Sequence, residues 1–395
     1  MEITLTVLII LSLLISTTSG KFNLTHRSPG QNLCTEVIQP VGYPCTERTI
    51  QTKDGYLLAL DRVSSRNGNP GMQRGPPVLL VHGIFMAGEA WLLNSPETSL
   101  LSILADQGFD VWIGNVRGTF WSYGHVSLSE KDKEFWDWTW QELALYDLSE
   151  MIHHIYSTTN SKILIVGHSQ GSMMSLAALT QPNIVEMVEA AAFLCPISYL
   201  KHFSAPLATK LVSIHLDEIV LAMGIHQLNI RSETFTKLLN SICDGHVDCK
   251  NLLSSVIGKN CCLNSSSIVK LYTYEPHPTS AKNMAHLCQM IRQGTFSKYD
   301  YGRSENLKLY GQEKPPEFDL SLIPKSFPLW MGYGGYDAVA NVTDVENTIK
   351  KFQTKPELLY IENYGHIDFL MSGHVKEDVY NHMIGFFRSL GKSRT

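Results

Sequence analysis

The fold of this chain is decided by one stretch of sequence, Lys162-Ile163-Leu164-Ile165-Val166-Gly167-His168-Ser169-Gln170-Gly171. A run of β-forming residues ends in the pattern Gly-x-Ser-x-Gly, and the residues that follow, 172–179, have the composition of a helix. A strand, a sharp turn and a helix form the context in which this pattern exposes a serine hydroxyl at the carboxyl edge of a sheet. The turn is so tight that a side chain at 167 or 171 would collide with the neighbouring strand or helix, which explains both glycines. We therefore predict that Ser169 is a nucleophile on a strained turn.

Strand and helix patterns alternate on both sides of this stretch. The turn Asp54-Gly55 between residues 49–52 and 56–60 predicts a hairpin. Further strands are expected at 78–81, 109–116, 190–194, 328–332 and 358–361, and helices at 99–107, 140–156 and 376–390. Strands that alternate with helices predict a mainly parallel sheet with helices on both faces.

The alternation stops near Pro196 and resumes near Pro328. Residues 197–323 hold helical patterns, most of the cysteines and two Pro-rich joints. This segment is predicted to be an insertion between two parts of one core, residues 21–196 and 324–395.

The composition excludes some classes of partner. The chain has 395 residues, of which 44% are apolar and 17% charged, and its net charge is -5. This length is enough for one large α/β domain with an insertion. No basic surface for nucleic acid is indicated, and a neutral or apolar substrate is favoured over an anionic one.

The first twenty residues are predicted to be a signal peptide. Leu5 to Ile15 is an almost unbroken apolar run, and small polar residues follow it up to Gly20. The leading region carries Glu2 and no Lys or Arg, so an uncleaved anchor is the alternative, but the run is short for a membrane span. No later stretch is long and apolar enough to be a stable transmembrane segment.

Sequons and cysteines agree with secretion. Glycosylation acceptor patterns occur at Asn23, Asn264 and Asn341. The eight cysteines are Cys34, Cys45, Cys195, Cys243, Cys249, Cys261, Cys262 and Cys288. The first two bracket a short loop and suit a disulfide, whereas Cys195 lies in an apolar strand-like run and is predicted to be a buried thiol. The last five are an odd number, so at least one of them is free or pairs elsewhere, and their pairing stays open.

A serine nucleophile needs a base within hydrogen-bond reach and a third group that orients the base. We call the sharp turn between strand and helix the elbow. Where a serine lies on such an elbow, its partners come in the order acid, then His, each on a loop after a later strand. Asp337 follows the strand expected at 328–332, and His366 follows the strand expected at 358–361. We predict Ser169 as the nucleophile, His366 as the general base and then acid, and Asp337 as the orienting carboxylate.

Other residues compete for these roles. Asp344 and Asp368 are alternatives for the acid, although Asp344 is placed where an acidic side chain favours the start of a helix. His286 and His374 are alternatives for the base, but the first lies in the insertion and the second follows the turn of the loop.

The oxyanion of a tetrahedral intermediate needs two preorganised N–H donors. One is the backbone N–H of the residue after the nucleophile, Gln170. The other is expected from the loop after the strand at 78–81, where we choose the N–H of Ile84, with Gly83 allowing the backbone to approach. His82 and His168 are expected to pack and hydrogen-bond locally.

Six motifs along the chain can be compared with those of known families. They are Leu80-Val81-His82-Gly83-Ile84, Phe109-Asp110-Val111-Trp112-Ile113-Gly114-Asn115-Val116-Arg117-Gly118, Glu134-Phe135-Trp136-Asp137-Trp138, Gly167-His168-Ser169-Gln170-Gly171, Gly334-Gly335-Tyr336-Asp337 and Tyr364-Gly365-His366-Ile367-Asp368-Phe369. Together they resemble the acid lipase family, which includes the gastric and lysosomal acid lipases. The Cys-rich residues 243–262 and Asn115-Val116-Arg117-Gly118 resemble its plant triacylglycerol lipase 1-like branch.

The resemblance implies an α/β-hydrolase fold in which residues 197–323 form a helical cap or lid. It implies hydrolysis of esters of acylglycerols or sterols, with Ser169, Asp337 and His366 as the triad and Ile84 and Gln170 as the oxyanion pair. The chain departs from the family pattern in two places. Many relatives have Leu at the position of Ile84, and many have a larger residue within 338–340, where this chain has Ala-Val-Ala.

The insertion contains an apolar stripe. Between Leu211 and Ile225, apolar residues at 212, 216, 219, 220 and 223 follow helical spacing. We expect one amphipathic helix here, which either packs on the core as a cap or acts as a lid whose apolar face turns to lipid.

The residues and the resemblance together predict a secreted serine lipase that hydrolyses triacylglycerol to diacylglycerol and fatty acid through an acyl-enzyme on Ser169. A general carboxylesterase, a sterol esterase or an acyltransferase of the same fold is the alternative, and the lysosome or vacuole is the alternative location. The expected partners are a lipid ester substrate and a lipid–water interface reached through the cap, and no nucleic acid. No zinc-type His/Cys spacing sits near the triad, so no metal and no cofactor is expected.

Overall fold

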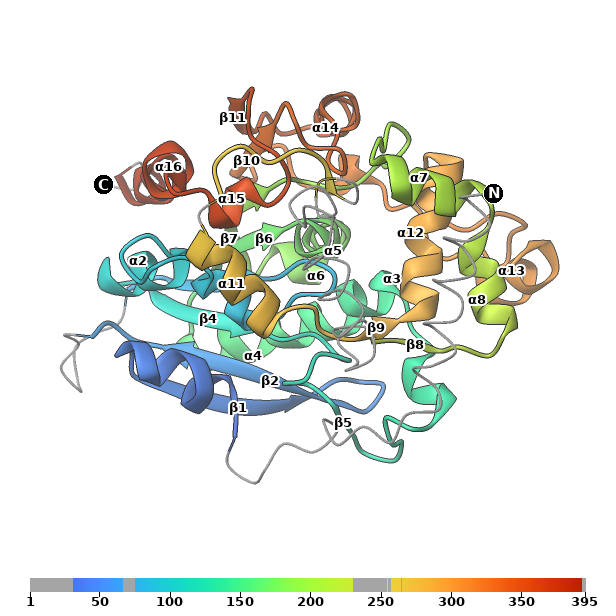
Figure 1. Cartoon of the computed structure of the whole chain (residues 1–395), viewed down its shortest axis with the longest axis horizontal. Helices are drawn as coiled ribbons and strands as arrows, with labels where there is room; N and C mark the ends of the chain where they lie inside the picture. Colours follow the sequence, from blue (N-terminus) through green and yellow to red (C-terminus); the bar gives the residue numbers. More distant parts are fainter. Residues whose placement is uncertain (1–30, 67–74, 230–253, 255–256, 264, 393–395) are drawn as a thin grey trace, which may run out of the picture.

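The computed structural model describes residues 31–66, 75–229, 254, 257–263 and 265–392 of the chain (Figure 1). The predicted signal peptide and the residues Asn23, Cys243, Cys249 and Asn264 lie outside the described residues. Among the described helices, none has both the length and the apolar character needed to cross a membrane.

One large sheet forms the centre of the described chain, and its strands run in the order β1-β2-β4-β3-β6-β7-β10-β11, with β5 beside β2. The strands are β1 (Cys45–Gln51), β2 (Tyr56–Val63), β3 (Pro77–Val81), β4 (Asp110–Gly114), β5 (Gly124–His125), β6 (Ile163–His168), β7 (Val188–Leu194), β10 (Leu329–Gly334) and β11 (Glu357–Ile361). From β4 to β11 all neighbours are parallel, and the β1–β2 hairpin joins β4 in antiparallel fashion. Every residue of β3, β4, β6 and β10 is buried, as expected of strands covered on both faces.

Helices connect these strands and cover the sheet (Figure 1). They are η1 (Cys34–Ile38), η2 (Gln39–Val41), η3 (Gly88–Leu92), α2 (Leu100–Asp106), η4 (Lys133–Trp136), α3 (Trp140–Glu142), η5 (Leu143–Leu148), α4 (Ser149–Thr159), α5 (Gln170–Leu179), α6 (Pro182–Val185), α14 (Val342–Ile349), α15 (Asp368–Met371), η7 (Lys376–Tyr380) and α16 (Asn381–Lys392). The crossover from β3 to β4 runs in one direction along the sheet, and those from β4 to β6 and from β6 to β7 run in the other. Because parallel crossovers are right-handed, α2 lies on the face opposite to α4 and α5. The predicted α/β architecture is confirmed.

The helix expected at 140–156 forms as one continuous helical segment, but its middle is a π-helix rather than an α-helix. The helix begins at a capping box formed by Thr139 and Glu142. The side chain of Thr139 accepts the N–H of Gln141, and Glu142 reaches back to the N–H of Thr139, so the first turn is capped from both sides.

The segment between β7 and β10 carries the helices of the predicted insertion. They are α7 (Pro206–Ser213), α8 (Leu216–Ala222), α11 (Ser265–Tyr274), α12 (Ala281–Gln293), α13 (Arg303–Tyr310) and η6 (Leu320–Leu322), together with a small sheet of β8 (Gln227–Leu228) and β9 (Thr279–Ser280). In Figure 1, α7, α8 and α12 lie together on one side of the main sheet. The boundaries at 197 and 323 stay a prediction.

The single amphipathic helix expected between Leu211 and Ile225 is wrong. The chain breaks it at His215, whose φ of 55° is left-handed, so that α7 ends and α8 begins with a new orientation. Val212, Leu216 and Val220 are buried as the stripe predicts, whereas the residues at 219 and 223 are exposed. The stripe is therefore buried only in part, and its members lie on two helices instead of one.

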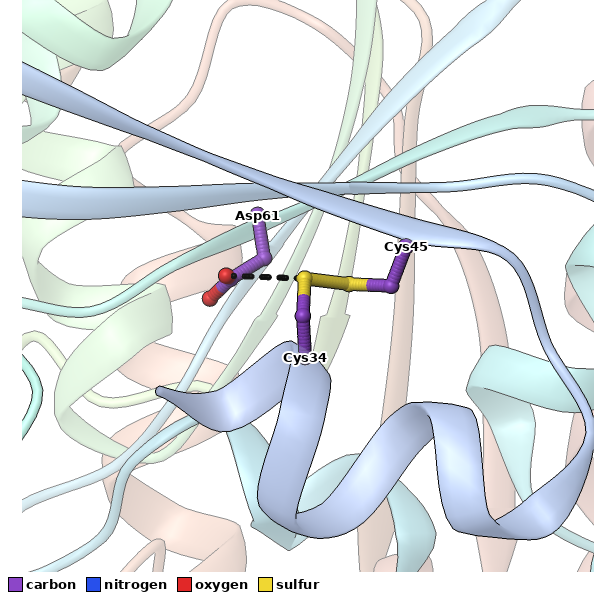
Figure 2. A group of neighbouring side chains, drawn as sticks. All are labelled: Cys34, Cys45 and Asp61. Carbon is purple, nitrogen blue, oxygen red and sulfur yellow. Dashed lines mark hydrogen bonds between the residues drawn. A yellow bond between two sulfur atoms is a disulfide. The ribbon is translucent and has the colours of Figure 1, made fainter. Parts of the chain in front are cut away.

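The predicted disulfide between Cys34 and Cys45 is present (Figure 2). It ties η1 to the first strand of the hairpin, and Oδ1 of Asp61 lies 3.3 Å from Sγ of Cys34. The other carboxylate oxygen of Asp61 accepts Nδ2 of Asn115 at 2.8 Å. Cys195 and Cys288 are free and buried, which confirms the buried thiol at 195 and leaves one of the last five cysteines unpaired. Cys261 and Cys262 form a disulfide with each other.

Arg117, from one of the motifs that resemble the acid lipases, is buried within the core. Its guanidinium bonds both oxygens of Asp54 in the hairpin turn, at 2.5 and 2.8 Å, and Oδ1 of Asp147 in η5 at 2.6 and 2.7 Å. It also lies 3.7 Å from the ring centroid of Tyr56. Burial raises the pKa of the Asp147 carboxyl even though Arg117 acts against it. The arginine thus joins the hairpin to the helix that precedes the elbow strand.

Replacing this arginine tests that role. Arg117→Ala is expected to lower the free energy of unfolding by about 3–5 kcal/mol, because it leaves the buried carboxylate of Asp147 without its cation. Urea denaturation would measure the loss. Arg303→Ala is the matched control, because Arg303 pairs with Glu313 at the surface, where such a pair contributes about 0–1 kcal/mol. Equal losses in the two variants would contradict a structural role for Arg117.

Candidate active site

The predicted elbow has the geometry that the motif requires. Ser169 lies between β6 and α5 with φ 55° and ψ -122°, a conformation that L-residues rarely adopt. A Cβ atom on Gly171 would lie 2.1 Å from the carbonyl oxygen of Val81, and one on Gly167 would lie 2.8 Å from the carbonyl oxygen of Gly171. Both glycines are therefore needed for close approach of the backbone, as expected from the sequence.

Three predicted residues meet at the carboxyl ends of their strands. Nε2 of His366 lies 2.8 Å from Oγ of Ser169, and Nδ1 of His366 lies 2.8 Å from Oδ2 of Asp337. Asp337 follows β10, and His366 follows β11. All three are buried, with exposed fractions of 5% or less. The structure brings together a hydroxyl, an imidazole and a carboxylate in the order that nucleophilic catalysis by serine needs.

The carboxylate is held in its ionised form. Burial alone would raise the pKa of Asp337, but the His366 charge, the His366 hydrogen bond and the N–H groups of Val339 and Ala340 outweigh it, so that the pKa is lowered. Those two N–H groups donate to Oδ1, each at 2.8 Å, which leaves Oδ2 for the imidazole. An ionised acceptor at Nδ1 keeps the proton on that nitrogen and leaves Nε2 free to accept from Ser169.

The competing residues are engaged elsewhere. Asp344 lies in the first turn of α14, where its oxygens contact N and Nδ1 of His202, each at 2.7 Å. His286 stacks on Trp140 and its Nε2 bonds the carbonyl oxygen of Ser297, while burial lowers its pKa to about 3. His374 is exposed at the surface. Asp344 and His286 thus bond residues of the insertion rather than the serine or its histidine.

Asp368 supports the histidine loop instead of acting as its acid. Its carboxylate accepts the N–H groups of Gly365, Cys261 and Cys262 at 2.7, 2.9 and 3.2 Å. Cys261 and Cys262 are adjacent and joined by a disulfide, and the N–H groups of both donate to the Asp368 carboxylate. This segment of the insertion thereby anchors the loop that carries His366.

The carbonyl oxygen of His366 has two further donors that the sequence did not reveal. Nε2 of His168 donates to it at 3.1 Å and Sγ of Cys195 at 3.3 Å. Both side chains are buried, and burial lowers the pKa of His168 to about 3 and raises the pKa of the Cys195 thiol. The position of Cys195 directly after β7, at the same sheet edge as the elbow, is the signal that could have placed it here.

The loop after β3 passes beside the nucleophile. A Cβ atom on Gly83 would lie 3.1 Å from Cβ and 3.5 Å from Oγ of Ser169, so a larger residue here would press on the nucleophile. His82 is buried, its pKa is lowered to about 4 by burial, and its Nε2 accepts the N–H of Val116 at 3.3 Å. The N–H groups of Ile84 and Gln170 belong to the residues that follow Gly83 and Ser169, so both remain candidates for the oxyanion site.

Two groups of metal-ligand type lie in the described part of the chain near this site. Cys195, Asp337 and His366 form one, and Glu89, Glu275 and His277 form the other. In each group the side chains already bond one another or the backbone. The absence of a cofactor stays a prediction. So does the glycan at Asn341, which is partly exposed and whose Oδ1 accepts the N–H of Thr343 at the start of α14.

Known proteins resemble this chain in sequence and in fold. A family described as a partial alpha/beta-hydrolase lipase region matches residues 34–95, and the alpha/beta hydrolase fold matches residues 76–222. Triacylglycerol lipase 1 of Arabidopsis thaliana is 60% identical over 98% of each chain. Gastric triacylglycerol lipase of Rattus norvegicus is 32% identical over 95% of this chain and 98% of its own. A solved carboxyl esterase from Bacillus coagulans, with a TM-score of 0.56 at 14% identity, covers 88% of this chain and 98% of its own and supports the fold alone.

Identity of this extent over nearly the whole length is more than a shared fold requires. The similarity also runs through the insertion and both parts of the core, not the elbow alone. The chain therefore belongs to the acid lipase family of α/β-hydrolases, together with plant and gastric triacylglycerol lipases.

Proposed function

We propose that the protein is a secreted serine lipase that hydrolyses triacylglycerol to diacylglycerol and fatty acid through an acyl-enzyme on Ser169. The observation that carries this proposal is the chain of hydrogen bonds from Ser169 through His366 to Asp337. The names of its relatives support the substrate class, because the relatives at 60% and 32% identity are triacylglycerol lipases.

The acylation step follows from the geometry of the three side chains. Nε2 of His366 takes the proton of Ser169 as Oγ attacks the ester carbonyl, and Asp337 stabilises the imidazolium that forms. The N–H groups of Ile84 and Gln170 then donate to the oxyanion of the tetrahedral intermediate. His366 returns the proton to the leaving alcohol, which departs as diacylglycerol.

The second half of the reaction uses the same groups on water. His366 takes a proton from a water molecule, the hydroxide attacks the acyl carbonyl on Ser169, and the fatty acid leaves as the proton returns to Oγ.

The insertion is the part that we propose to meet lipid. Two of its helical regions expose large apolar side chains: Ile214, Ile219 and Met223 in and beside α8, and Val269 and Tyr272 in α11. Exposed apolar groups of this kind are costly in water and bind readily to a lipid–water interface. Secretion, with the lysosome or vacuole as the alternative destination, rests on the predicted signal peptide.

A substrate series tests the function. Triacylglycerol emulsion, sterol ester and soluble ester are offered to the purified protein, and release of fatty acid is measured by titration. We expect faster turnover of triacylglycerol than of sterol ester, with diacylglycerol as the first product. Faster turnover of the sterol ester would instead assign a sterol esterase.

The contact with lipid is tested with a short triacylglycerol across its solubility limit. The rate is expected to rise steeply once droplets form, because the insertion then has an apolar surface to bind. A rate that saturates in the monomeric range, before droplets appear, would rule out activation at an interface and leave the esterase chemistry untouched.

A further inference from the structure

A buried joint of the insertion contacts the loop that carries the proposed oxyanion donor. The joint is Glu275-Pro276-His277, between α11 and β9, and we name it the cap joint. The loop is residues 82–88, which run from the end of β3 to the first residue of η3, and we name it the oxyanion loop. Glu275 and His277 are 4% and 1% exposed, so these contacts are shielded from water.

The cap joint holds the main chain of the oxyanion loop at two points. The N–H of His277 donates to the carbonyl oxygen of Phe85 at 2.8 Å. The N–H of Ala87 donates to Oε1 of Glu275 at 3.3 Å. Phe85 itself has a φ of 59°, an unfavourable conformation for an aromatic residue that persists only where the surroundings determine it. The cap joint supplies part of those surroundings directly beside Ile84.

Hydrogen bonds from the core hold the two ends of the same loop. Nε2 of His82 accepts the N–H of Val116, and Oδ1 of Asn115 accepts the N–H of Gly88 at 2.9 Å. Within the loop, the N–H of Met86 donates to the carbonyl oxygen of Gly83 at 3.3 Å, which closes a turn around Ile84. The orientation of that turn relative to Ser169 therefore depends on the contacts at Phe85 and Ala87.

The imidazole of His277 is fixed on both sides. The N–H of Phe120 donates to its Nδ1 at 3.1 Å, so Nδ1 is the acceptor and Nε2 carries the proton. Nε2 lies 2.7 Å from Oε1 of Glu89, whose Oε2 accepts Nε1 of Trp121 at 2.7 Å. Buried polar groups are costly unless they are paired, and this network pairs them across the insertion and the core.

We propose that Glu275 and His277 are positioning residues for the oxyanion site: they fix the oxyanion loop so that the N–H of Ile84 faces the reacting carbonyl at Ser169. The inference rests on the proposed function and adds a role for the insertion in the chemistry itself. This role requires the cap joint to stay in place while substrate enters, because a cap joint that left the loop would remove an oxyanion donor.

Substitutions at Glu275 separate positioning from folding. Glu275→Leu removes the acceptor for Ala87, and Glu275→Gln keeps an oxygen at the same distance. For hydrolysis of p-nitrophenyl butyrate we expect kcat to fall about 100-fold in Glu275→Leu, because loss or misplacement of one oxyanion donor costs at least that much. KM is expected to stay within about 3-fold, and Glu275→Gln to retain kcat within about 5-fold, since the lost contact acts on the transition state.

A spectroscopic reading and a matched control complete the experiment. The ester carbonyl stretch of the acyl-enzyme should shift to higher frequency in Glu275→Leu, since it loses a hydrogen bond. The control is Asn306→Ala, which removes a buried side chain of the same insertion that donates to Oδ1 of Asp300 and to the carbonyl oxygen of Glu313. It should lower Tm and leave kcat and the carbonyl frequency unchanged. Should Glu275→Leu fail to fold, Glu275→Asp keeps the charge and is too short to reach Ala87, and the same loss of kcat is expected.

The result that overturns the inference is a folded Glu275→Leu or Glu275→Asp with the kcat of the control, or a rise in KM alone. A Glu275→Gln variant as slow as Glu275→Leu would also overturn it, because the acceptor would then not be the feature that matters. Ser169→Ala is measured in the same series. Its inactivity together with a normal Glu275→Leu sinks only the positioning role, whereas activity in Ser169→Ala sinks the proposed function.

Discussion

Replacing Ser169 by alanine is expected to lower kcat on a triacylglycerol emulsion by about 10⁶-fold, because the acyl-enzyme cannot form without Oγ and His366 then has no hydroxyl to activate. Binding of the emulsion should be unchanged, since the substitution removes one buried atom. Release of fatty acid by titration measures the rate.

The matched control lies on α5, the helix that follows Ser169. Ser175→Ala removes a buried hydroxyl that donates to the carbonyl oxygen of Gly171 at 2.7 Å and does not touch the triad. It should keep kcat within about 3-fold. If Ser169→Ala retained more activity than a background preparation, the reaction would not pass through this serine.

Asp337→Asn is expected to lower kcat by about 10⁴-fold. Oδ1 can still accept the N–H groups of Val339 and Ala340, so the asparagine amide would point its NH₂ group at Nδ1 of His366. That donor forces the proton to Nε2, where the imidazole can no longer accept from Ser169. Stopped-flow release of p-nitrophenol measures the acylation step, and thermal unfolding verifies that the fold is intact.

The rival acid on α14 provides the comparison. Asp344→Asn removes a carboxylate that is buried equally deeply and pairs with His202 instead of His366. Its kcat should stay within about 5-fold of the parent protein, with a lower Tm. The reverse pattern, an inactive Asp344→Asn and an active Asp337→Asn, would show that Asp344 and not Asp337 is the acid of the triad.

The central residues could be predicted because their determinants are local. Gly167, Gly171 and Ser169 are the residue types that the turn needs, and the mainly parallel sheet follows from the alternation of strand and helix patterns along the chain. Asp337 and His366 follow from the order of strands and loops after the elbow. The structure places each of the three side chains after the strand that the sequence predicts, whereas their catalytic roles stay predictions.

Other features depend on packing between segments far apart in the chain. The contact of His277 with Glu89 joins residues separated by 188 positions, and no local pattern announces it. The same is true of Asp368, whose carboxylate accepts the N–H groups of Cys261 and Cys262 from a distant part of the chain. The sequence pattern does not reveal the break between α7 and α8 at His215, for a different reason. Helical periodicity continues across it, because a single left-handed residue leaves no mark in the spacing of apolar residues.

The most direct test of the account is covalent trapping of the nucleophile. An alkyl p-nitrophenyl phosphonate is incubated with the protein, and peptide mass spectrometry locates the adduct while lipase activity is followed in parallel. We expect one phosphonyl group per chain, attached to Ser169, with activity lost in proportion to the label. A fully labelled protein that still hydrolyses triacylglycerol, or an adduct at another residue that accompanies the loss of activity, would contradict it.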